Sequence, residues 1–336
     1  MGNNGMFHSA FRIPHSAFAV MQRYPRWLKQ SFSPHGVARE VRSLVGDLGL
    51  VTVCESALCP NLRECYSQRQ LTFMILGSRC TRSCRFCAVD HGRPQPVEAD
   101  EPWRVAEAVK RLGLRHIVIT SVARDDLRDE GAWHFVRVIH AVRRENPGVT
   151  VEILVPDFHA REELVRLVLD EGQPEVFAHN VETVERLSDL LRPQANYRRS
   201  LRVLQFAAAH PPSPAAASKR ESRRRASERL RPTGLPGGLH GGDTIVKSSV
   251  MVGLGETQEE LVQTFHDLVG IGVTHLTIGQ YLRPDADHLP VMEFVSPERF
   301  CLYEALAYEH GFAWVKAGPF VRSSYHAIDA LQRVES

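Results

Sequence analysis

Clustered cysteines constrain this chain more than any other feature of its sequence. Six of the seven cysteines fall within 34 residues and form two groups of three. The first group has the spacing C-x4-C-x5-C and consists of Cys54, Cys59 and Cys65. The second has the spacing C-x3-C-x2-C, follows the apolar stretch Leu71–Leu76, and consists of Cys80, Cys84 and Cys87. In a chain of 336 residues this clustering indicates metal ligation in a reducing compartment instead of a disulfide framework.

The number of thiols per group distinguishes between the metals. Three soft ligands can hold three irons of a four-iron, four-sulfur cluster and leave the last iron open. Structural zinc sites close with four ligands, usually as paired C-x2-C units, and neither group has that form. Ferredoxins use four cysteines per cluster with a terminal Cys-Pro, whereas Cys59-Pro60 lies in the middle of its group. Two iron–sulfur sites are therefore favoured over zinc, and one of them needs a fourth ligand that is not cysteine.

The motifs resemble a known family. An aromatic residue, Phe86, precedes the third cysteine of C-x3-C-x2-C, as in the radical S-adenosylmethionine superfamily. From about Pro25 to the C-terminus the two groups together closely resemble the lipoyl synthase family. The resemblance is carried by runs such as CPNLREC, TFMILGSRCTRSCRFCAVDHGRP, ITSVARDDLRDEGAWHF, VFAHNVETV, MVGLGET, QYLRPDADHLPV and GPFVRSSYHA.

Strand and helix patterns alternate along the chain. Strands are expected at Leu71–Leu76, His116–Ser121, Thr150–Val155, Val176–Ala178, Thr244–Val252 and Thr274–Ile278. Helices are expected at about 102–112, 132–145, 160–170, 182–190, 196–209 and 257–270. Parallel strands with right-handed crossovers follow from this order. For this superfamily they imply an α/β fold, an open, partial TIM-type barrel of about six β/α units.

The resemblance also implies a division of the chain. Residues 1–24 are expected to be a disordered tail, and 25–70 an N-terminal extension with the Cys54 group. The barrel would span 71–295, and 296–336 would form a C-terminal extension with the run RSSY. Within the barrel, 211–242 contain five prolines, five glycines, seven basic and two acidic residues. We expect 211–243 to be a disordered insertion, because so polar a segment cannot offset its ordering entropy.

The resemblance implies a role for each cysteine group. The cluster on the Cys80 group would bind S-adenosylmethionine and cleave it to a 5′-deoxyadenosyl radical. That radical would remove hydrogen from C6 and C8 of an octanoyl chain on a lysine of a carrier domain. The cluster on the Cys54 group would donate two sulfurs, which makes the chain a sulfurtransferase. Its missing ligand is expected to be Ser324, with Ser323 as the second choice.

Polar residues and glycines at the expected strand ends are candidates for contacts with S-adenosylmethionine. They are Ser121, Asp125, Asn180, Glu182, Lys247, Gly253 and Arg283. Two positions depart from the family pattern. Asp129-Glu130-Gly131 replaces Asp-Gly-Gly, and Ser249 stands where the family more often has glycine.

Partners and location follow from the same resemblance. Expected partners are octanoylated lipoyl carrier domains of 2-oxoacid dehydrogenases and the glycine cleavage system. An electron donor such as ferredoxin or flavodoxin and iron–sulfur carrier proteins are expected as well. No apolar run approaches 18 residues, so no membrane span is expected. We expect a cytoplasmic protein, or a mitochondrial one if residues 1–24 act as a transit peptide.

Two other functions compete at this level, and one cysteine is left over. Another two-cluster enzyme, such as a methylthiotransferase or a biotin synthase-like sulfur inserter, would differ in cysteine spacing and lack RSSY. A zinc-bearing module could bind nucleic acid through the Arg-rich insertion, although no nucleic-acid partner is expected. Without 211–242 the chain has 34 basic and 37 acidic residues, a net charge of −3. The seventh cysteine, Cys301, lies in a helical pattern and is expected to be buried.

Overall fold

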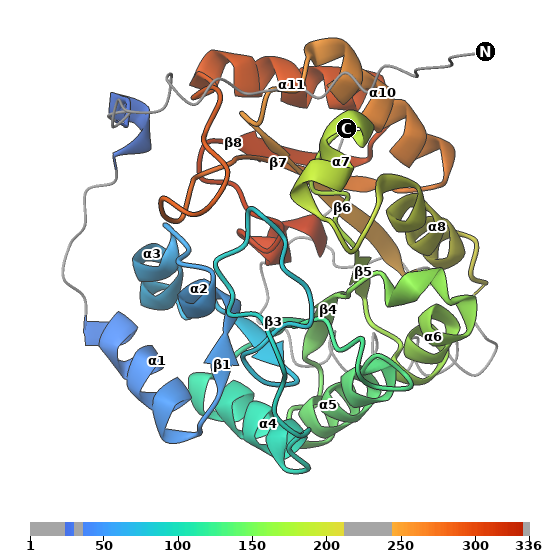
Figure 1. The fold of residues 1–336 in the computed structure, drawn as a ribbon. Helices are drawn as coiled ribbons and strands as arrows, with labels where there is room; N and C mark the ends of the chain where they lie inside the picture. The colour runs from blue at the N-terminus through green and yellow to red at the C-terminus, as the bar shows by residue number, and fades with distance from the viewer. Residues whose placement is uncertain (1–23, 30–35, 212–243, 332–336) are drawn as a thin grey trace, which may run out of the picture.

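The computed structural model describes residues 24–29, 36–211 and 244–331 of the chain (Figure 1). The expected N-terminal tail up to residue 23 and the Arg-rich insertion at 212–243 lie outside the described residues. None of the helices in the described ranges is long and apolar enough to cross a membrane.

One sheet of eight strands forms the centre of the fold, with the strands in the order β1 to β8. The strands are β1 (Val51–Thr52), β2 (Thr72–Ile75), β3 (His116–Ser121), β4 (Thr150–Leu154), β5 (Val176–Ala178), β6 (Ile245–Val252), β7 (His275–Gln280) and β8 (Trp314–Gly318). β1 pairs antiparallel with β2, and every later pair is parallel. Most residues of β2 to β7 are buried, because helices cover the outside of the sheet and side chains fill the inside.

Helices surround the sheet on its outer side (Figure 1). The longer ones are α1 (Gly36–Asp47), α4 (Glu101–Leu112), α5 (Ala132–Glu145), α8 (Tyr197–Ala208), α10 (Gln258–Gly270) and α11 (Pro297–Glu309). The shorter ones are η2 (Arg26–Leu28), α2 (Val53–Ser56), α3 (Leu62–Ser67), η3 (Phe158–Ala160), α6 (Glu162–Leu167), η4 (Val168–Gly172), α7 (Glu185–Leu191) and η5 (Ala327–Leu331). α10 begins with a capping box in which the hydroxyl of Thr257 accepts from the N–H of Glu260.

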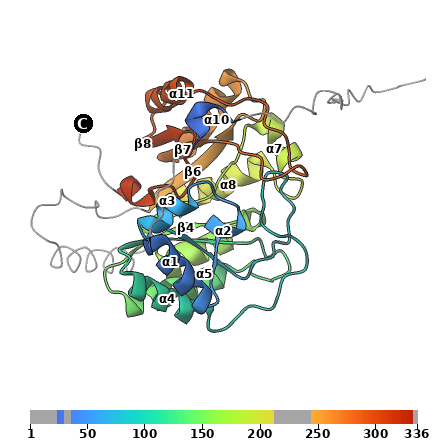
Figure 2. The same ribbon diagram turned by 90° about the vertical axis from the view of Figure 1, so that its left-hand side faces the viewer.

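The barrel is open on one side. Among the described strands no pairing joins β8 to β1, and α2 and α3 lie at this opening (Figure 1). The segment that follows β8 returns along the opening and ends in η5. Figure 2 shows η5 at the opposite end of the barrel from the loop that follows β2. The ring of His275, the first residue of β7, contacts the carbonyl of Ala330 in η5, which agrees with this placement.

The expected open, partial TIM-type barrel is confirmed, and two details differ from expectation. The sheet continues beyond the six expected units, because β8 pairs with β7 although it lies in the expected C-terminal extension. The prediction that Cys301 is buried is wrong, because this side chain is exposed. α11 buries the face formed by Phe300, Tyr303 and Ala307, and Cys301 projects about 100° away from Phe300 on the helix.

Candidate functional site

The Cys80 group lies on the loop 76–100, at the carboxyl end of β2. Cys80 forms an isolated parallel bridge with His91, so the loop folds back on itself. The sulfur of Cys80 accepts hydrogen bonds from the backbone N–H groups of Arg82 at 3.4 Å and Ala123 at 3.3 Å. Hydrogen bonds of this kind to sulfur stabilise and tune thiolate-bound clusters.

The thiols of this group influence one another. Burial raises the pKa of the Cys84 thiol to about 12, and the neighbouring Cys87 adds to the rise. Burial raises the pKa of Cys87 to about 11, with a further contribution from Cys80. The three sulfurs are therefore near enough for their charges to repel, and a bound metal is needed to hold all of them as thiolates.

A buried arginine fixes this loop to the barrel. Arg82 lies between the first two cysteines and is 6% exposed. Its guanidinium pairs with Asp125 at 2.7 Å, after β3, and with Asp157 at 2.8 Å, after β4. Burial alone would raise the pKa of Asp157, but the charges of Arg82 and Arg199 outweigh it, and the pKa lies below its usual value. Two neighbouring strand ends thus hold the cysteine loop.

The segment after β7 closes on the same loop. Nε2 of His288 lies 3.0 Å from the carbonyl oxygen of Cys87, and Nδ1 lies 2.6 Å from the Asp285 carboxylate. Both partners are acceptors, so the imidazole ring links the Asp285 carboxylate to the cysteine loop. Arg283, expected to contact the cofactor, donates instead to the carbonyl of His288 at 2.8 Å. In this structure Arg283 holds the segment that contacts Cys87.

The Cys54 group is carried by α2, α3 and the turn between them. The N–H of Cys59 bonds to the carbonyl of Cys54 at 3.0 Å, and the N–H of Cys65 to that of Asn61 at 2.9 Å. Leu58, with φ of 50°, makes the tight turn before Cys59. The pKa of the Cys54 and Cys65 thiols is raised to about 12. Burial is the main cause, and the other thiols of the group contribute to the rise.

The segment 319–326, which follows β8, lies against this second group. The side-chain amide of Asn61 donates to the carbonyl of Phe320 at 2.6 Å. The hydroxyl of Tyr325 donates to Glu64 at 3.0 Å. Between them, Ser324 accepts a hydrogen bond from the hydroxyl of Thr72 at 2.8 Å. Residues 320–325 therefore lie beside the segment that carries the Cys54 group, and Ser324 lies on the side of this segment that faces the group.

The residues present fit iron–sulfur clusters. All six thiols are free, and within the described ranges neither group has a fourth cysteine, since Cys301 lies exposed on α11. Burial lowers the pKa of Arg322 and the charge of Cys59 opposes this, which places a cation beside the second group. Soft thiols in threes, with N–H donors or a cation beside them, are ligands suited to iron.

Three of the expected cofactor contacts lie near the Cys80 group with polar atoms available. The hydroxyl of Ser121 and the side-chain oxygen of Asn180 are buried and have no hydrogen-bond partner among the described residues. Glu182 is half-buried in the left-handed conformation, with φ of 68°. Burial raises its pKa, which the charge of Arg192 and a hydrogen bond from Asn180 partly oppose. A ligand with donor groups would satisfy all three side chains.

The expectation that Lys247 contacts the cofactor is corrected. Lys247 is the third residue of β6, five residues before its end, or about 16 Å along the strand. Its ammonium pairs with Glu152 at 2.8 Å, and both side chains are 1% exposed. The lysine neutralises a buried carboxylate near the amino end of the barrel. The sequence could not reveal this, because Glu152 looks like an ordinary alternating strand residue.

Two other expected contacts have partners within the chain. Asp125 accepts from Arg82 and, at 2.9 Å, from the hydroxyl of Thr81, so it holds the cysteine loop. Gly253, with φ of 92°, follows β6, and a Cβ there would come within 2.4 Å of the carbonyl oxygen of Glu293. Glycine is therefore required at position 253 by packing as well as by backbone conformation.

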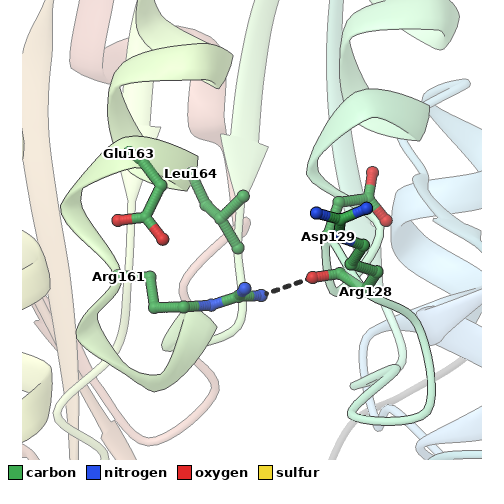
Figure 3. Close-up of a pocket in the computed structure, with 5 residues that line it drawn as sticks. All are labelled: Arg128, Asp129, Arg161, Glu163 and Leu164. Atoms are coloured by element: carbon green, nitrogen blue, oxygen red, sulfur yellow. Dashed lines mark hydrogen bonds between the residues drawn. The ribbon is translucent and has the colours of Figure 1, made fainter.

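Glu130, the departure from Asp-Gly-Gly, is almost fully buried. Its carboxylate oxygen lies 2.8 Å from Nδ1 of His159 and 3.0 Å from the guanidinium of Arg161. Asp125, Glu130 and His159 together could hold a cation, but each carboxylate already pairs with an arginine. Beside them, a groove of about 490 Å³ is lined by Arg128, Asp129, Arg161, Glu163 and Leu164 (Figure 3). Charges of both signs line this groove, and no cysteine does.

Sequence reasoning missed several residues of the site. Arg82 carried a signal, since it is a charged residue inside a cysteine motif, and such a residue must find a partner once buried. Asp157 and Thr72 carried none, because their partners lie far away in sequence. Only the fold brings them together.

Comparison with known proteins identifies the family of the chain. The Radical SAM superfamily model matches residues 74–212. The chain is 47% identical over 305 residues to a lipoyl synthase of Caldanaerobacter subterraneus subsp. tengcongensis, covering 91% of this chain and 96% of that protein. It is 47% identical over 303 residues to a lipoyl synthase of Rubrobacter xylanophilus, covering 90% and 85%.

A solved structure extends the comparison to the fold. SuiB of Streptococcus suis, bound to S-adenosylmethionine, matches with a TM-score of 0.50 and 8% identity, over 76% of this chain and 53% of that one. The relatives exclude the zinc-bearing nucleic-acid module and the other sulfur-inserting enzymes. The chain belongs to the lipoyl synthase family and is a radical S-adenosylmethionine sulfurtransferase.

Proposed function

We propose that the two cysteine groups hold two four-iron, four-sulfur clusters with separate roles. Cys80, Cys84 and Cys87 would hold the cluster that binds S-adenosylmethionine. Cys54, Cys59, Cys65 and Ser324 would hold the cluster that donates sulfur to C6 and C8 of a protein-bound octanoyl-lysine. The observation that supports this division is that the segment 319–326 lies against the Cys54 group, where Ser324 would provide an oxygen ligand for that group.

The chain's own residues would bind and position, and the cofactors would supply the reactive chemistry. When bound, the first cluster and S-adenosylmethionine supply hydrogen abstraction, and the second cluster supplies sulfur. Ser121, Asn180 and Glu182 would bind polar groups of S-adenosylmethionine, since their buried or half-buried polar atoms need partners. Arg82 would keep the cysteine loop at the strand ends. The surrounding barrel would keep water away from the reacting carbons.

The proposed partners are those of this reaction. Octanoylated lipoyl carrier domains of 2-oxoacid dehydrogenases and of the glycine cleavage system would be the protein substrates. A ferredoxin or flavodoxin would supply electrons, and iron–sulfur carrier proteins would rebuild the consumed cluster. A reducing compartment such as the cytoplasm keeps the six thiols available as ligands.

A single-turnover experiment on an octanoyl-lysine peptide tests the division. We expect Cys84→Ala to form no 5′-deoxyadenosine and no sulfur-containing product. Cys59→Ala should still form 5′-deoxyadenosine but add no sulfur to the peptide, read by mass. Cys301→Ala is the matched control, because this cysteine is exposed on α11, and it should keep both activities. Full two-sulfur product from Cys59→Ala without added sulfide would overturn the proposal.

A further inference from the structure

Thr72 contacts two proposed ligands that lie far apart in the sequence, Cys54 and Ser324. It is the first residue of β2 and is 3% exposed. Its backbone N–H hydrogen-bonds the Cys54 thiol. Its hydroxyl donates to Ser324 at 2.8 Å. One residue thus links a cysteine of the second group to the serine that would complete it.

The two partners differ in how firmly they are held. Thr72 lies in the core sheet, in register with Val118 of β3, and the next residue, Phe73, is paired with Thr52 of β1. As a β-branched residue in a strand, it also has few side-chain rotamers. Ser324 lies outside any strand or longer helix, in the segment that follows β8. The hydroxyl of Thr72 is therefore a fixed point, and the position of Ser324 depends on it.

The direction of the hydrogen bond matters for iron binding. The serine oxygen accepts the hydrogen bond, so it keeps a lone pair for a metal. The contact with Thr72 can therefore hold the serine oxygen in place while that lone pair points toward the iron site.

We propose that Thr72 is a positioning residue that holds Ser324 against the Cys54 group and sets how fast the oxygen-ligated iron is lost. This inference rests on the proposed function, since it takes Ser324 as the fourth ligand. Thr72 itself contacts no reacting atom. Its role is exerted through Ser324 and through the thiol of Cys54.

The test measures iron release to a colorimetric chelator, in full-length protein that carries only the second cluster because Cys80, Cys84 and Cys87 are alanine. Thr72→Val removes the donor and keeps the shape. We expect iron release about fivefold faster, since a neutral hydrogen bond contributes about 1 kcal/mol, which changes an equilibrium by about that factor. Thr72→Ser keeps the donor and should stay within about twofold of the parent protein.

A matched control separates positioning from a general loss of stability. Thr120 is a buried threonine on the neighbouring strand β3, and its hydroxyl donates to the carbonyl of Leu154 at 2.9 Å. Thr120→Val loses one buried hydrogen bond of similar size but touches neither Cys54 nor Ser324. It should release iron at the parent rate, and an equal acceleration in Thr120→Val would overturn the proposal.

A second variant distinguishes this inference from the function on which it rests. Ser324→Ala should also release iron faster, and adding Thr72→Val to it should change nothing further. If Ser324→Ala is faster and Thr72→Val is not, Thr72 has no positioning role while Ser324 remains a ligand. If Ser324→Ala releases iron at the parent rate, the ligand assignment itself fails and the role of Thr72 falls with it.

Discussion

The two cysteine groups lie in one barrel but are held by different forces. The Cys80 group is fixed by ion pairs, with the buried Arg82 between the buried Asp157 and the more exposed Asp125. The Cys54 group is closed by individual hydrogen bonds between the two ends of the chain, over separations of 252 to 261 residues. Two of these three bonds join uncharged groups. The first site is part of the barrel, whereas the second depends on a segment that docks against it.

The difference matches the separate roles that we propose for the two sites. Removing one partner of a buried ion pair costs about 3–5 kcal/mol, whereas a neutral hydrogen bond contributes about 1 kcal/mol. A cluster that persists through many turnovers needs a rigid loop. A cluster that is consumed and rebuilt needs a ligand segment that can leave and return. The two kinds of attachment provide these properties within one molecule.

The largest expected effect comes from Arg82→Gln, which removes the arginine partner of Asp125 and leaves the buried Asp157 with Arg199 alone. We expect the cluster-free protein to lose about 3 kcal/mol of stability, measured by chemical denaturation. The loaded protein should lose most of its cleavage of S-adenosylmethionine, measured as 5′-deoxyadenosine. Arg79→Gln, an exposed arginine on the same loop, is the control and should behave like the parent. Unchanged stability in Arg82→Gln would show that charge does not hold this site.

The complementary change displaces the docking segment. A Cβ at Gly279 in β7 would lie 2.1 Å from the carbonyl oxygen of Val321. Gly279→Ala should therefore push the segment 319–326 away, at a cost of about 2 kcal/mol. Sulfur insertion should fall at least tenfold while 5′-deoxyadenosine formation continues. Gly270→Ala in α10, where nothing lies within 4 Å of the added Cβ, should keep both. Parallel loss of both activities in Gly279→Ala would mean that the two sites are not independent.

How much of this could be predicted from sequence differs between the two groups. The cysteines and the expected strands follow from local patterns, because motif spacing and strand periodicity are local properties, whereas the open barrel follows from the resemblance to the superfamily. β8 is not among the expected strands, although Trp314 and Val315 are buried, because its residues fall in the stretch expected to form a C-terminal extension. The candidates Ser121, Asn180 and Glu182 were found because residues after parallel strands meet at one edge.

Residues whose role depends on distant partners could not be predicted. Lys247 looked like a cofactor contact because its neighbours form a family motif, but its depth in β6 and its pairing with Glu152 on β4 depend on how the strands are arranged in the sheet. Thr72 is one β-branched residue among several in a strand. Nothing local distinguishes it from Thr120, and only the return of the chain end to β2 gives it a special partner.

A smaller effect is expected from Tyr325→Phe. The hydroxyl of Tyr325 donates to the Glu64 carboxylate, and hydrogen bonds to charged groups are worth about 1.5 kcal/mol or somewhat more. We expect the loss of this one contact to loosen the docking segment without displacing it, so that sulfur insertion falls two- to fivefold. Tyr308→Phe is the matched control. Tyr308 lies on α11, and its hydroxyl donates to the carbonyl of Val315 in β8. A fall as large as that of Gly279→Ala would mean that this contact alone holds the segment.

The last prediction concerns the pH dependence of the free energy of unfolding. It depends on a histidine of the barrel, His116, that belongs to neither cysteine group. Burial, followed by the charge of Lys247, lowers the pKa of His116 from 6.5 to about 3. A pKa lowered in the folded state gives stability that is present above 6.5 and is lost as the pH falls from there toward 3. Between pH 7.5 and 5.5 this one histidine should cost the cluster-free protein about 1.4 kcal/mol. His116→Gln should remove that part of the pH dependence in chemical denaturation, whereas His266→Gln, exposed on α10, should not. An unchanged slope in His116→Gln would place the acid sensitivity in other buried histidines of the barrel, with His179 and His275 as the first groups to test, because burial lowers the pKa of each to about 4. The carboxylates around Arg82 would not explain it, because their pKa values lie below the usual range and they stay ionised between pH 7.5 and 5.5.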